Sequence, residues 1–205
     1  MASDRIVVVD VETSGLNPLQ DSLIAVGAVA VHDSRIEFED SFYAVVRQTQ
    51  PSSAANIVVH GIGGTEQLHG AAPAEVLEQW LRYAADAPAA GFHVDFDRLV
   101  IERDVRKTLG QRVRMKWLDL ATLLPVLFPE EAGITRSLDE WTKLFGIEIY
   151  QRHNALSDAL ATAQLLQVAL ARAAREGAHS VKQIVRLERD ARWLASHQAA
   201  RHPWA

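Results

Sequence analysis

Two acidic residues, Asp10 and Glu12, stand two positions apart directly after an apolar, β-branched run, Ile6–Val9. Such a run is typical of a buried strand, and side chains two positions apart on a strand point to the same face of its sheet. Two neighbouring carboxylates repel each other, and a divalent cation relieves that repulsion. Taken alone, the pair has a second interpretation, because acidic residues also terminate buried strands as solvated ends.

Two further segments place acidic residues at the beginnings of predicted helices. Asp95 and Asp97 follow the apolar stretch Ala89–Val94, whereas Asp158 lies inside the first turns of a later helix, with His153 just before that helix. A carboxylate in a first turn also caps a helix, and a lone histidine before a helix is commonly polar surface, so neither segment is specific by itself. The three segments occur in order, each at a strand end or a helix start, and together they indicate one metal site with a histidine beside it.

The apolar pattern around these segments predicts strands first and then an alternation of helices and strands. β-branched runs separated by turn residues predict an antiparallel meander of three strands, Arg5–Asp10, Leu23–Val31 and Ile36–Val46. The remaining predicted elements are a helix from Pro73, a strand Ala89–Val94, a helix Asp95–Leu109, a strand Met115–Leu118, and helices Leu120–Leu127, Ser137–Phe145 (with a capping box of Ser137 and Glu140) and Ala155–Arg175. This order is typical of an α/β fold in which a mixed sheet, an antiparallel meander followed by parallel strands, is flanked by helices.

The composition limits the chemistry that these residues can support. The chain has 205 residues, 48% of them hydrophobic, which is enough for one domain with a buried core. It has no cysteine, so thiolate zinc sites and cysteine nucleophiles are excluded, and a metal held by carboxylates is expected to be Mg²⁺ or Mn²⁺. A net charge of −5 argues against a protein that grips long nucleic acid by bulk electrostatics. Apolar stretches are too short for a membrane span and the N-terminus lacks a secretory pattern, so we expect a cytoplasmic protein without membrane contact.

Three segments match short motifs of a known superfamily: Val9–Leu16, Phe96–Asp97 and His153–Asp158, the last of the form H-x-A-x-x-D. Over roughly Ile6–Leu170 the chain therefore resembles the DEDDh (DnaQ-like, RNase T-like) exonucleases. The resemblance implies a ribonuclease H-like fold and hydrolysis of phosphodiester bonds at a 3′ end, with release of nucleoside monophosphates. It also implies two divalent ions, Mg²⁺ or Mn²⁺, and a general base.

By the same resemblance, four acidic residues hold the two ions and a histidine removes a proton from the attacking water. Asp10 would bridge both ions. Glu12 and Asp158 would bind the ion that activates water, and Asp97 would act on the other ion through water. His153 would be the general base, since imidazole exchanges protons near neutral pH.

Other residues near the motifs have both a functional and a structural interpretation. The resemblance implies that Thr13, Leu16 and His60 hold the terminal nucleotide, with Leu16 wedged against the last base. Turn formation and core packing would explain the first two residues without a substrate. Asp95 departs from the superfamily pattern, which often has a small or amide residue there, so the metal role is assigned to the next acid, after the phenylalanine. Asp119 is expected to be a helix N-cap and no more.

The end of the chain differs in character from the rest. Gly177 is expected to end the long helix, which divides the chain into an exonuclease domain at 1–176 and a tail at 177–205. The tail mixes arginines with apolar residues, including Trp193 and Leu194, and is expected to form an amphipathic helix packed on the same domain. A contact with nucleic acid or with a protein such as a polymerase is the alternative. Because every residue assigned to chemistry precedes Ser180, deletion from there onward is expected to leave the chemistry intact.

The expected partner is the 3′ end of a nucleic acid, with single-stranded DNA as the first expectation. RNA is the alternative, because the 2′-hydroxyl contacts that would distinguish it are not identifiable in the sequence. The enzyme would be freestanding or a proofreading subunit of a DNA polymerase, and the lack of a recognisable polymerase-binding peptide in the tail favours the first. A silent nucleic-acid-binding scaffold is disfavoured, since it would have no physical reason to keep four repelling acids and a histidine together. The sequence does not indicate an oligomeric state.

Overall fold

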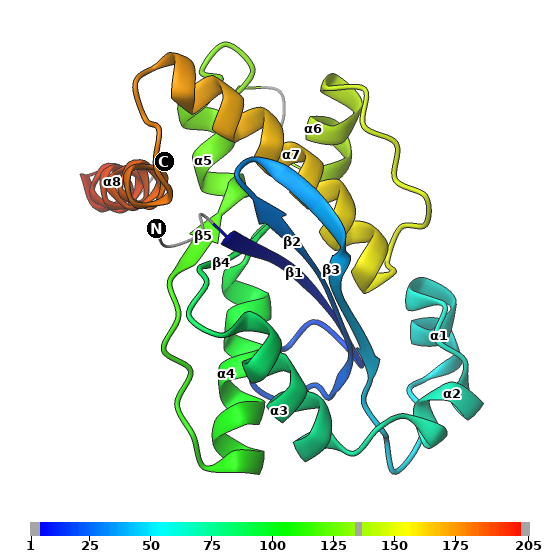
Figure 1. Cartoon of the computed structure of the whole chain (residues 1–205). Coiled ribbons are helices and arrows are strands. Elements are labelled where there is room, and N and C mark those ends of the chain that lie inside the picture. The colour runs from blue at the N-terminus through cyan, green and yellow to red at the C-terminus, as the bar shows by residue number, and fades with distance from the viewer. Residues whose placement is uncertain (1–4, 134–136, 202–205) are drawn as a thin grey trace.

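The computed structural model describes residues 5–133 and 137–201, and a mixed sheet divides their helices into two layers (Figure 1). The strands follow the spatial order β3-β2-β1-β4-β5. In chain order they are β1 (Arg5–Thr13), β2 (Leu23–His32), β3 (Arg35–Val45), β4 (Ala89–Gly91) and β5 (Trp117–Asp119). The first three pair antiparallel, whereas β4 pairs parallel with β1, and β5 parallel with β4. The predicted fold, an antiparallel meander followed by parallel strands, is confirmed.

Helices cover both faces of the sheet. They are α1 (Ala54–His60), α2 (Gly64–His69), α3 (Pro73–Ala84), α4 (Asp95–Leu109), α5 (Leu120–Leu127), α6 (Leu138–Leu144), α7 (Ala155–Arg175) and α8 (Val181–Arg201). The helices α3 and α4 pack on one face, and α5 and α7 pack on the other (Figure 1). The short helices α1 and α2 lie beyond the far edge of the sheet, after β3. None of the helices in 5–133 and 137–201 is both long enough and apolar enough to cross a membrane.

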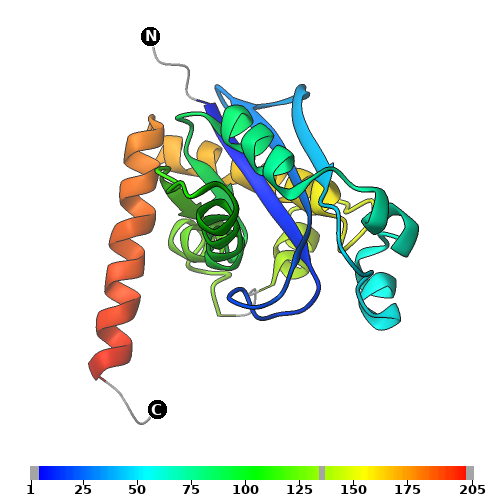
Figure 2. The same ribbon diagram turned by 90° about the horizontal axis from the view of Figure 1, so that it is seen from below.

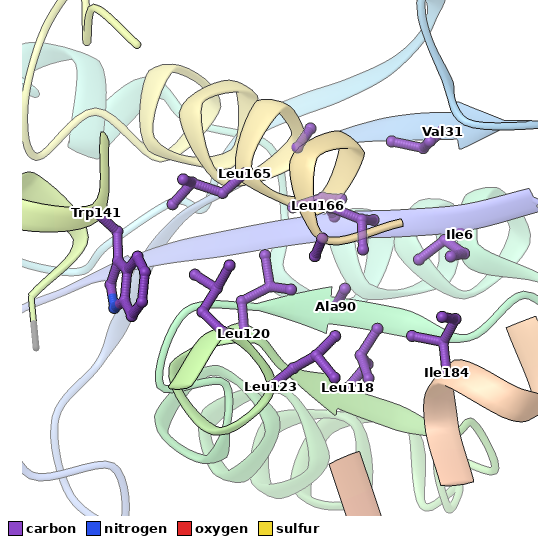
Figure 3. Packing of buried hydrophobic residues seen from close by; sticks show 14 of the residues in the cluster. Ile6, Val31, Ala90, Leu118, Leu120, Leu123, Trp141, Leu165, Leu166 and Ile184 are labelled. Carbon is purple, nitrogen blue, oxygen red and sulfur yellow. The ribbon is translucent and has the colours of Figure 1, made fainter. Parts of the chain in front are cut away.

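The alternation of side chains along β1 explains why the sheet has two cores. Val7 and Val9 point to the layer of α3 and α4, where they join a cluster around Trp80. Ile6 and Val8 point to the opposite layer. Figure 3 shows this second cluster, in which side chains from β5, α5, α7 and α8 meet: Leu118, Leu120, Leu123, Leu165, Leu166 and Ile184. A strand buried on both faces needs apolar residues at every position, as the run of valines in β1 provides.

Several predicted boundaries differ from the structure. The predicted strand Ala89–Val94 ends at Gly91, because the chain turns sharply at His93, which has a left-handed φ of +57°. The strand predicted at Met115–Leu118 is shifted to β5, and β1 continues through Thr13. The helix α1 was not predicted, because it is short and its three adjacent β-branched residues do not show helical spacing. By contrast, the capping box at the start of α6 and the N-cap of α5 by Asp119 are confirmed.

The tail forms one helix, α8, which runs along one side of the domain (Figure 2). It contacts α5 and β5, and Ile184 from its first turns is 1% exposed within the core. Trp193 and Leu194, by contrast, are more than half exposed. Residues 202–205 of the expected tail lie outside the residues that the structure describes.

Candidate active site

The strand β1 carries the first two acidic residues on the face that α7 covers. Asp10 and Glu12 continue the row of Ile6 and Val8, because alternate residues of a strand share a face. Asp10 pairs with Gly27 of β2, and Glu12 pairs with Ala25 of the same strand. The acids therefore project from a part of β1 that pairs with β2, toward the start of α7.

Gly27 allows α7 to begin directly on the sheet. A Cβ at this glycine would lie 2.3 Å from both the carbonyl carbon of Ala155 and the amide nitrogen of Leu156, so no larger residue fits without movement of the helix. The helix starts at Asn154, whose side-chain oxygen accepts a hydrogen bond from the N–H of Ser157 at 3.1 Å. This N-cap and the close approach bring the first turns of α7, which carry Asp158, over β1.

Asp10, Glu12 and Asp158 converge on one point. Each offers an oxygen such that all three oxygens lie within 4.8 Å of one another. Asp158 is 3% exposed, and its buried Oδ1 has no hydrogen-bond partner among the residues that the structure describes. A buried carboxylate oxygen without a partner is costly, and a cation between the three groups would satisfy it. The donor set therefore fits a hard divalent cation such as Mg²⁺ or Mn²⁺.

Asp97 reaches the site from the first turn of α4. Its Oδ1 accepts a hydrogen bond from the N–H of Val11 at 2.9 Å, and the side chain is buried. It lies outside the tight group of three oxygens, although it is close enough to raise the pKa of Asp10. Asp95, by contrast, binds Arg98 and Arg192 on the other side of the turn. The two acids of this segment therefore point to different surroundings, Asp97 to β1 and Asp95 to the arginines.

The electrostatics of the group favour bound cations. Burial, together with the neighbouring Asp97 and Glu12, raises the pKa of Asp10 well above its ordinary value. Burial and the charge of Asp158 raise the pKa of Glu12 to about 8, and burial raises the pKa of Asp97 to about 8. Burial also raises the pKa of Asp158, while Arg152 opposes that shift. Divalent cations would stabilise the charged forms that burial and mutual repulsion disfavour.

Arg152 is a member of the site that the sequence did not single out. Its guanidinium binds Oδ2 of Asp158 through one nitrogen and Oδ1 of Asp139 through Nε, the latter at 2.6 Å. Its positive charge opposes the rise in the pKa of each of the three converging acids. The available signal was its position next to His153, a basic residue adjoining an expected catalytic one.

His153 lies at the rim of the site. It adopts a left-handed φ of +57°, and its backbone N–H donates to Oδ2 of Asp158 at 3.0 Å. Strained backbone of this kind persists where surrounding contacts hold it, and it is concentrated at functional sites. The side chain is exposed and lines the same cavity as the three acids, so it is accessible to water and substrate.

A cavity of about 760 Å³ opens over the acids and reaches two of the three expected substrate residues. Thr13 and Leu16 line it, and Leu16 is 93% exposed. His60 does not reach it: the ring is buried, Nε2 lies within hydrogen-bond distance of Ser52 and Asn56, and Nδ1 accepts from the N–H of the residue two positions on. Asn56, together with the residues Val59, Phe92 and Phe96, lines the cavity instead.

A second cavity, of about 670 Å³, lies at the opposite end of the strands. Arg5, Lys116 and Lys182 line it, and Asp86 is the one acidic residue in its lining. It therefore lacks the convergent carboxylates that a cation site requires. We place the active site in the first cavity.

Comparisons with known proteins identify the family and the fold of this chain. A family model described as Exonuclease, RNase_T, matches residues 7–166. The DNA polymerase III PolC-type of Latilactobacillus sakei subsp. sakei (strain 23K) is 32% identical over 167 residues, which make up 81% of this chain and 11% of that protein. The PolC-type polymerase of Bacillus subtilis (strain 168) is 31% identical over 180 residues, 86% of this chain and 12% of that protein. The chain thus spans about an eighth or less of the length of these curated relatives.

Solved structures show the same fold. E. coli exonuclease I in complex with a dT13 oligonucleotide superposes with a TM-score of 0.71 and 16% identity, over 83% of this chain and 42% of that one. Exonuclease X in complex with 5′ overhanging duplex DNA superposes with a TM-score of 0.70 and 21% identity, over 89% of this chain and 99% of that one. These likenesses confirm the predicted ribonuclease H-like architecture.

Proposed function

Because this chain belongs to the RNase_T exonuclease family, we propose that it removes nucleotides one at a time from the 3′ end of DNA, assisted by two divalent cations. Membership makes the chain a hydrolytic exonuclease. The polarity, the DNA substrate, the cations and the roles of single residues are part of this proposal.

One observation carries the proposal. The oxygens of Asp10, Glu12 and Asp158 converge within 4.8 Å at the floor of a cavity whose rim carries His153 and the exposed Leu16. The partnerless Oδ1 of Asp158 supports a cation there, because no other described group satisfies it. Hydrolysis at the end of a nucleic-acid strand requires a cation site, a proton acceptor and an apolar contact for the terminal nucleobase.

The acidic residues would hold the cations. Asp10, Glu12 and Asp158 would bind directly, and Asp97 would complete the set from α4. Bound Mg²⁺ or Mn²⁺ would neutralise charge on the phosphate and on the leaving oxygen and would make water a better nucleophile. Arg152 would add a further positive charge at the same wall of the cavity.

His153 would move the proton in the hydrolytic step. Water adds to the phosphorus as His153 takes a proton from it, and the bond between phosphorus and the 3′ oxygen of the preceding nucleotide breaks. The departing oxygen takes a proton from solvent. The products are a nucleoside 5′-monophosphate and a strand one nucleotide shorter, with a 3′-hydroxyl. The exposed ring at the cavity rim is in a position to exchange the proton with bulk water.

The terminal nucleotide would lie against the exposed apolar surface of the cavity. Leu16 would contact the last base, and the hydroxyl of Thr13, which donates to the carbonyl of Gly15 at 2.6 Å, would hold the turn that presents it. Asn56 and Phe96 would form the opposite walls of the cavity. His60 would act through Asn56, with which its ring is in contact.

The comparisons support DNA as the substrate. Both solved relatives are described in complex with DNA, and the curated relatives are DNA polymerases. Exonuclease X is matched over 99% of its own chain, and a freestanding enzyme is the setting that we propose. The match to PolC-type polymerases supports proofreading as the alternative setting for the same reaction.

The decisive experiment is a degradation time course on oligonucleotides of one sequence, prepared as single-stranded DNA, as duplex DNA and as RNA. A 5′ label should reveal a ladder of strands shortened from the 3′ end, with Mg²⁺ or Mn²⁺ and not with chelator. Asp10→Asn is the matched inactive control, because it removes one charge and keeps the shape of the side chain. A ladder that persists in chelator, shortening from the 5′ end, or faster cleavage of RNA than of DNA would each contradict the corresponding part of the proposal.

A further inference from the structure

An ion cluster joins the last helix to the start of α4. Arg192 of α8 donates from Nε to Oε1 of Glu188 at 2.9 Å, and its Nη1 donates to Oδ2 of Asp95 at 2.5 Å. Glu188 is 4% exposed, so this guanidinium is held from its own helix by a buried partner. A residue near the end of the chain therefore binds the first residue of the helix that carries Asp97.

The same guanidinium faces a second acid that holds the turn before α4. Nη2 of Arg192 lies 3.8 Å from Oδ2 of Asp119, which is 6% exposed. The other oxygen of Asp119 accepts hydrogen bonds from the N–H of His93 at 2.9 Å and from that of Val94 at 3.4 Å. Asp119 thus holds the backbone N–H groups of His93 and Val94. The positive charge of Arg192 lies between the carboxylates of Asp119 and Asp95.

This turn, 92–96, is a wall of the active site. Phe92, His93 and Phe96 line the cavity over the acids, and Asp97 follows directly. His93 has a φ of +57°, a conformation that is unfavourable for a residue with a side chain and needs support from its surroundings. The hydrogen bonds to Asp119 provide that support, so the turn depends on contacts that reach back to α8.

We infer that Arg192 is a positioning residue for the active site: from α8 it clamps Asp95 and Asp119, and it thereby fixes the turn that forms one cavity wall and places Asp97. The inference rests on the function proposed above. It also implies that the tail is not dispensable for chemistry, unlike the expectation drawn from the order of residues along the chain. Removal of α8 would take away Ile184 from the core together with the clamp.

The clamp can be opened from either end. Arg192→Ala removes it from α8, although it leaves the buried Glu188 without its partner. Asp95→Ala removes it from α4 and leaves the contact between Arg192 and Glu188 intact. Arg189→Ala is the matched control, because its guanidinium lies on the same helix, is 71% exposed and binds Asp190 next to it. Arg192→Lys should keep part of the wild-type protection of the turn, since lysine keeps the charge but not the planar pair of donors.

The first measurement is amide hydrogen exchange in metal-free protein without nucleic acid. Arg192→Ala and Asp95→Ala should both speed exchange in 92–96 relative to β2, whereas Arg189→Ala should match the wild type. The second is Mn²⁺ affinity by calorimetry, with kcat and KM on a DNA oligomer. Loss of a partner that orients a metal ligand typically lowers affinity or turnover by roughly 10- to 100-fold, and we expect that range for both variants.

These measurements separate the inference from the proposed function. If the wild type degrades no nucleic acid, the proposed function fails, while exchange in 92–96 still tests the clamp. If the wild type is active and both clamp variants match Arg189→Ala in exchange and in Mn²⁺ affinity, the clamp is overturned. Should Arg192→Ala not fold, Asp95→Ala carries the same test, because it leaves Ile184 in the core and the contact between Arg192 and Glu188 in place. Faster exchange throughout β2, without a local excess in the turn, would also overturn it in favour of a purely structural role.

Discussion

The backbone N–H of Val11 donates a 2.9 Å hydrogen bond to Oδ1 of Asp97, and this bond joins β1 to α4. Val11 lies between Asp10 and Glu12, so the bond connects the two acids of the strand to the acid of the helix. Along the edge of β1 that faces β4, Val7 and Val8 pair with β4. Further along the same edge, the carboxylate of Asp97 accepts the hydrogen bond of Val11. Asp97 therefore has a structural task in addition to its proposed role with a cation.

Two substitutions at Asp97 should separate these tasks. Asp97→Asn keeps an acceptor for Val11 and should retain stability while losing exonuclease activity. Asp97→Ala leaves a buried N–H unpaired and should lower the free energy of unfolding by about 1–3 kcal/mol as well. Urea denaturation in chelator, with activity on a labelled strand, checks both. Equal stability of the two variants would contradict the structural task of the bond.

The stability of the metal-free protein should depend on the charge of Glu12. Burial and Asp158 raise the pKa of Glu12 from 4.5 to about 8. Between these pH values the folded protein holds a proton that the unfolded chain has lost, so stability should fall as pH rises from about 4.5 to about 8. The whole decline should be on the order of a few kcal/mol, and Asp10, Asp97 and Asp158, whose pKa values burial also raises, should share it. Glu12→Gln should therefore make the decline shallower.

The measurement is urea denaturation in chelator at several pH values, repeated with Mg²⁺. Cations that bind the charged acids should remove most of the decline in the wild type. Glu148→Gln, an exposed glutamate of the same chain, is the control and should keep the wild-type slope. A Glu12→Gln protein whose stability falls as steeply as that of the wild type would show that this carboxyl is not the titrating group.

Patterns within a few residues predicted most of the fold. The alternation in β1 predicted that Asp10 and Glu12 share a face, and local cap signals predicted the helix starts at Asp119 and Ser137. These features depend on neighbours along the chain, so a sequence displays them directly. The three motifs likewise lie at a strand or at the starts of helices, which the sheet topology brings to one place.

Contacts between distant segments were not predictable in this way. The bond between Arg192 and Asp95 joins residues 97 positions apart, and neither residue has a local signal that names the other. The only sequence signal for Arg152 was its position beside His153. His60, expected to hold a nucleotide, lies buried against Asn56, because the helix α1 that positions both was not recognised from its apolar pattern.

His153 precedes α7 and Asp158 lies in its first turn, and substitutions at the two residues should have different effects. The backbone N–H of His153, not its ring, contacts Oδ2 of Asp158 at 3.0 Å, so His153→Ala should leave Mn²⁺ affinity nearly unchanged. Turnover should fall by roughly 10²- to 10⁴-fold, the usual contribution of a positioned general base. Asp158→Asn should weaken Mn²⁺ binding and turnover together, because it removes a ligand charge.

Calorimetry and kcat at saturating Mn²⁺ distinguish these outcomes. His153→Asn is the control for the backbone, since asparagine tolerates a φ of +57°. A variant with full rate would remove His153 from the reaction, and a variant that loses Mn²⁺ as severely as Asp158→Asn would make the ring a ligand.

The glycine opposite Asp10 should control the assembly of the whole site. A Cβ at Gly27 would lie 2.3 Å from backbone atoms of Ala155 and Leu156, a distance that no side-chain rotation can relieve. Gly27→Ala should therefore push the start of α7, and Asp158 with it, away from β1. We expect a stability loss of about 1–3 kcal/mol and a parallel loss of Mn²⁺ affinity and exonuclease activity. Gly63→Ala is the matched control, because its φ is −63° and a Cβ there would meet nothing within 4 Å. If Gly27→Ala binds Mn²⁺ as tightly as Gly63→Ala, the close approach of α7 to the sheet does not position the site.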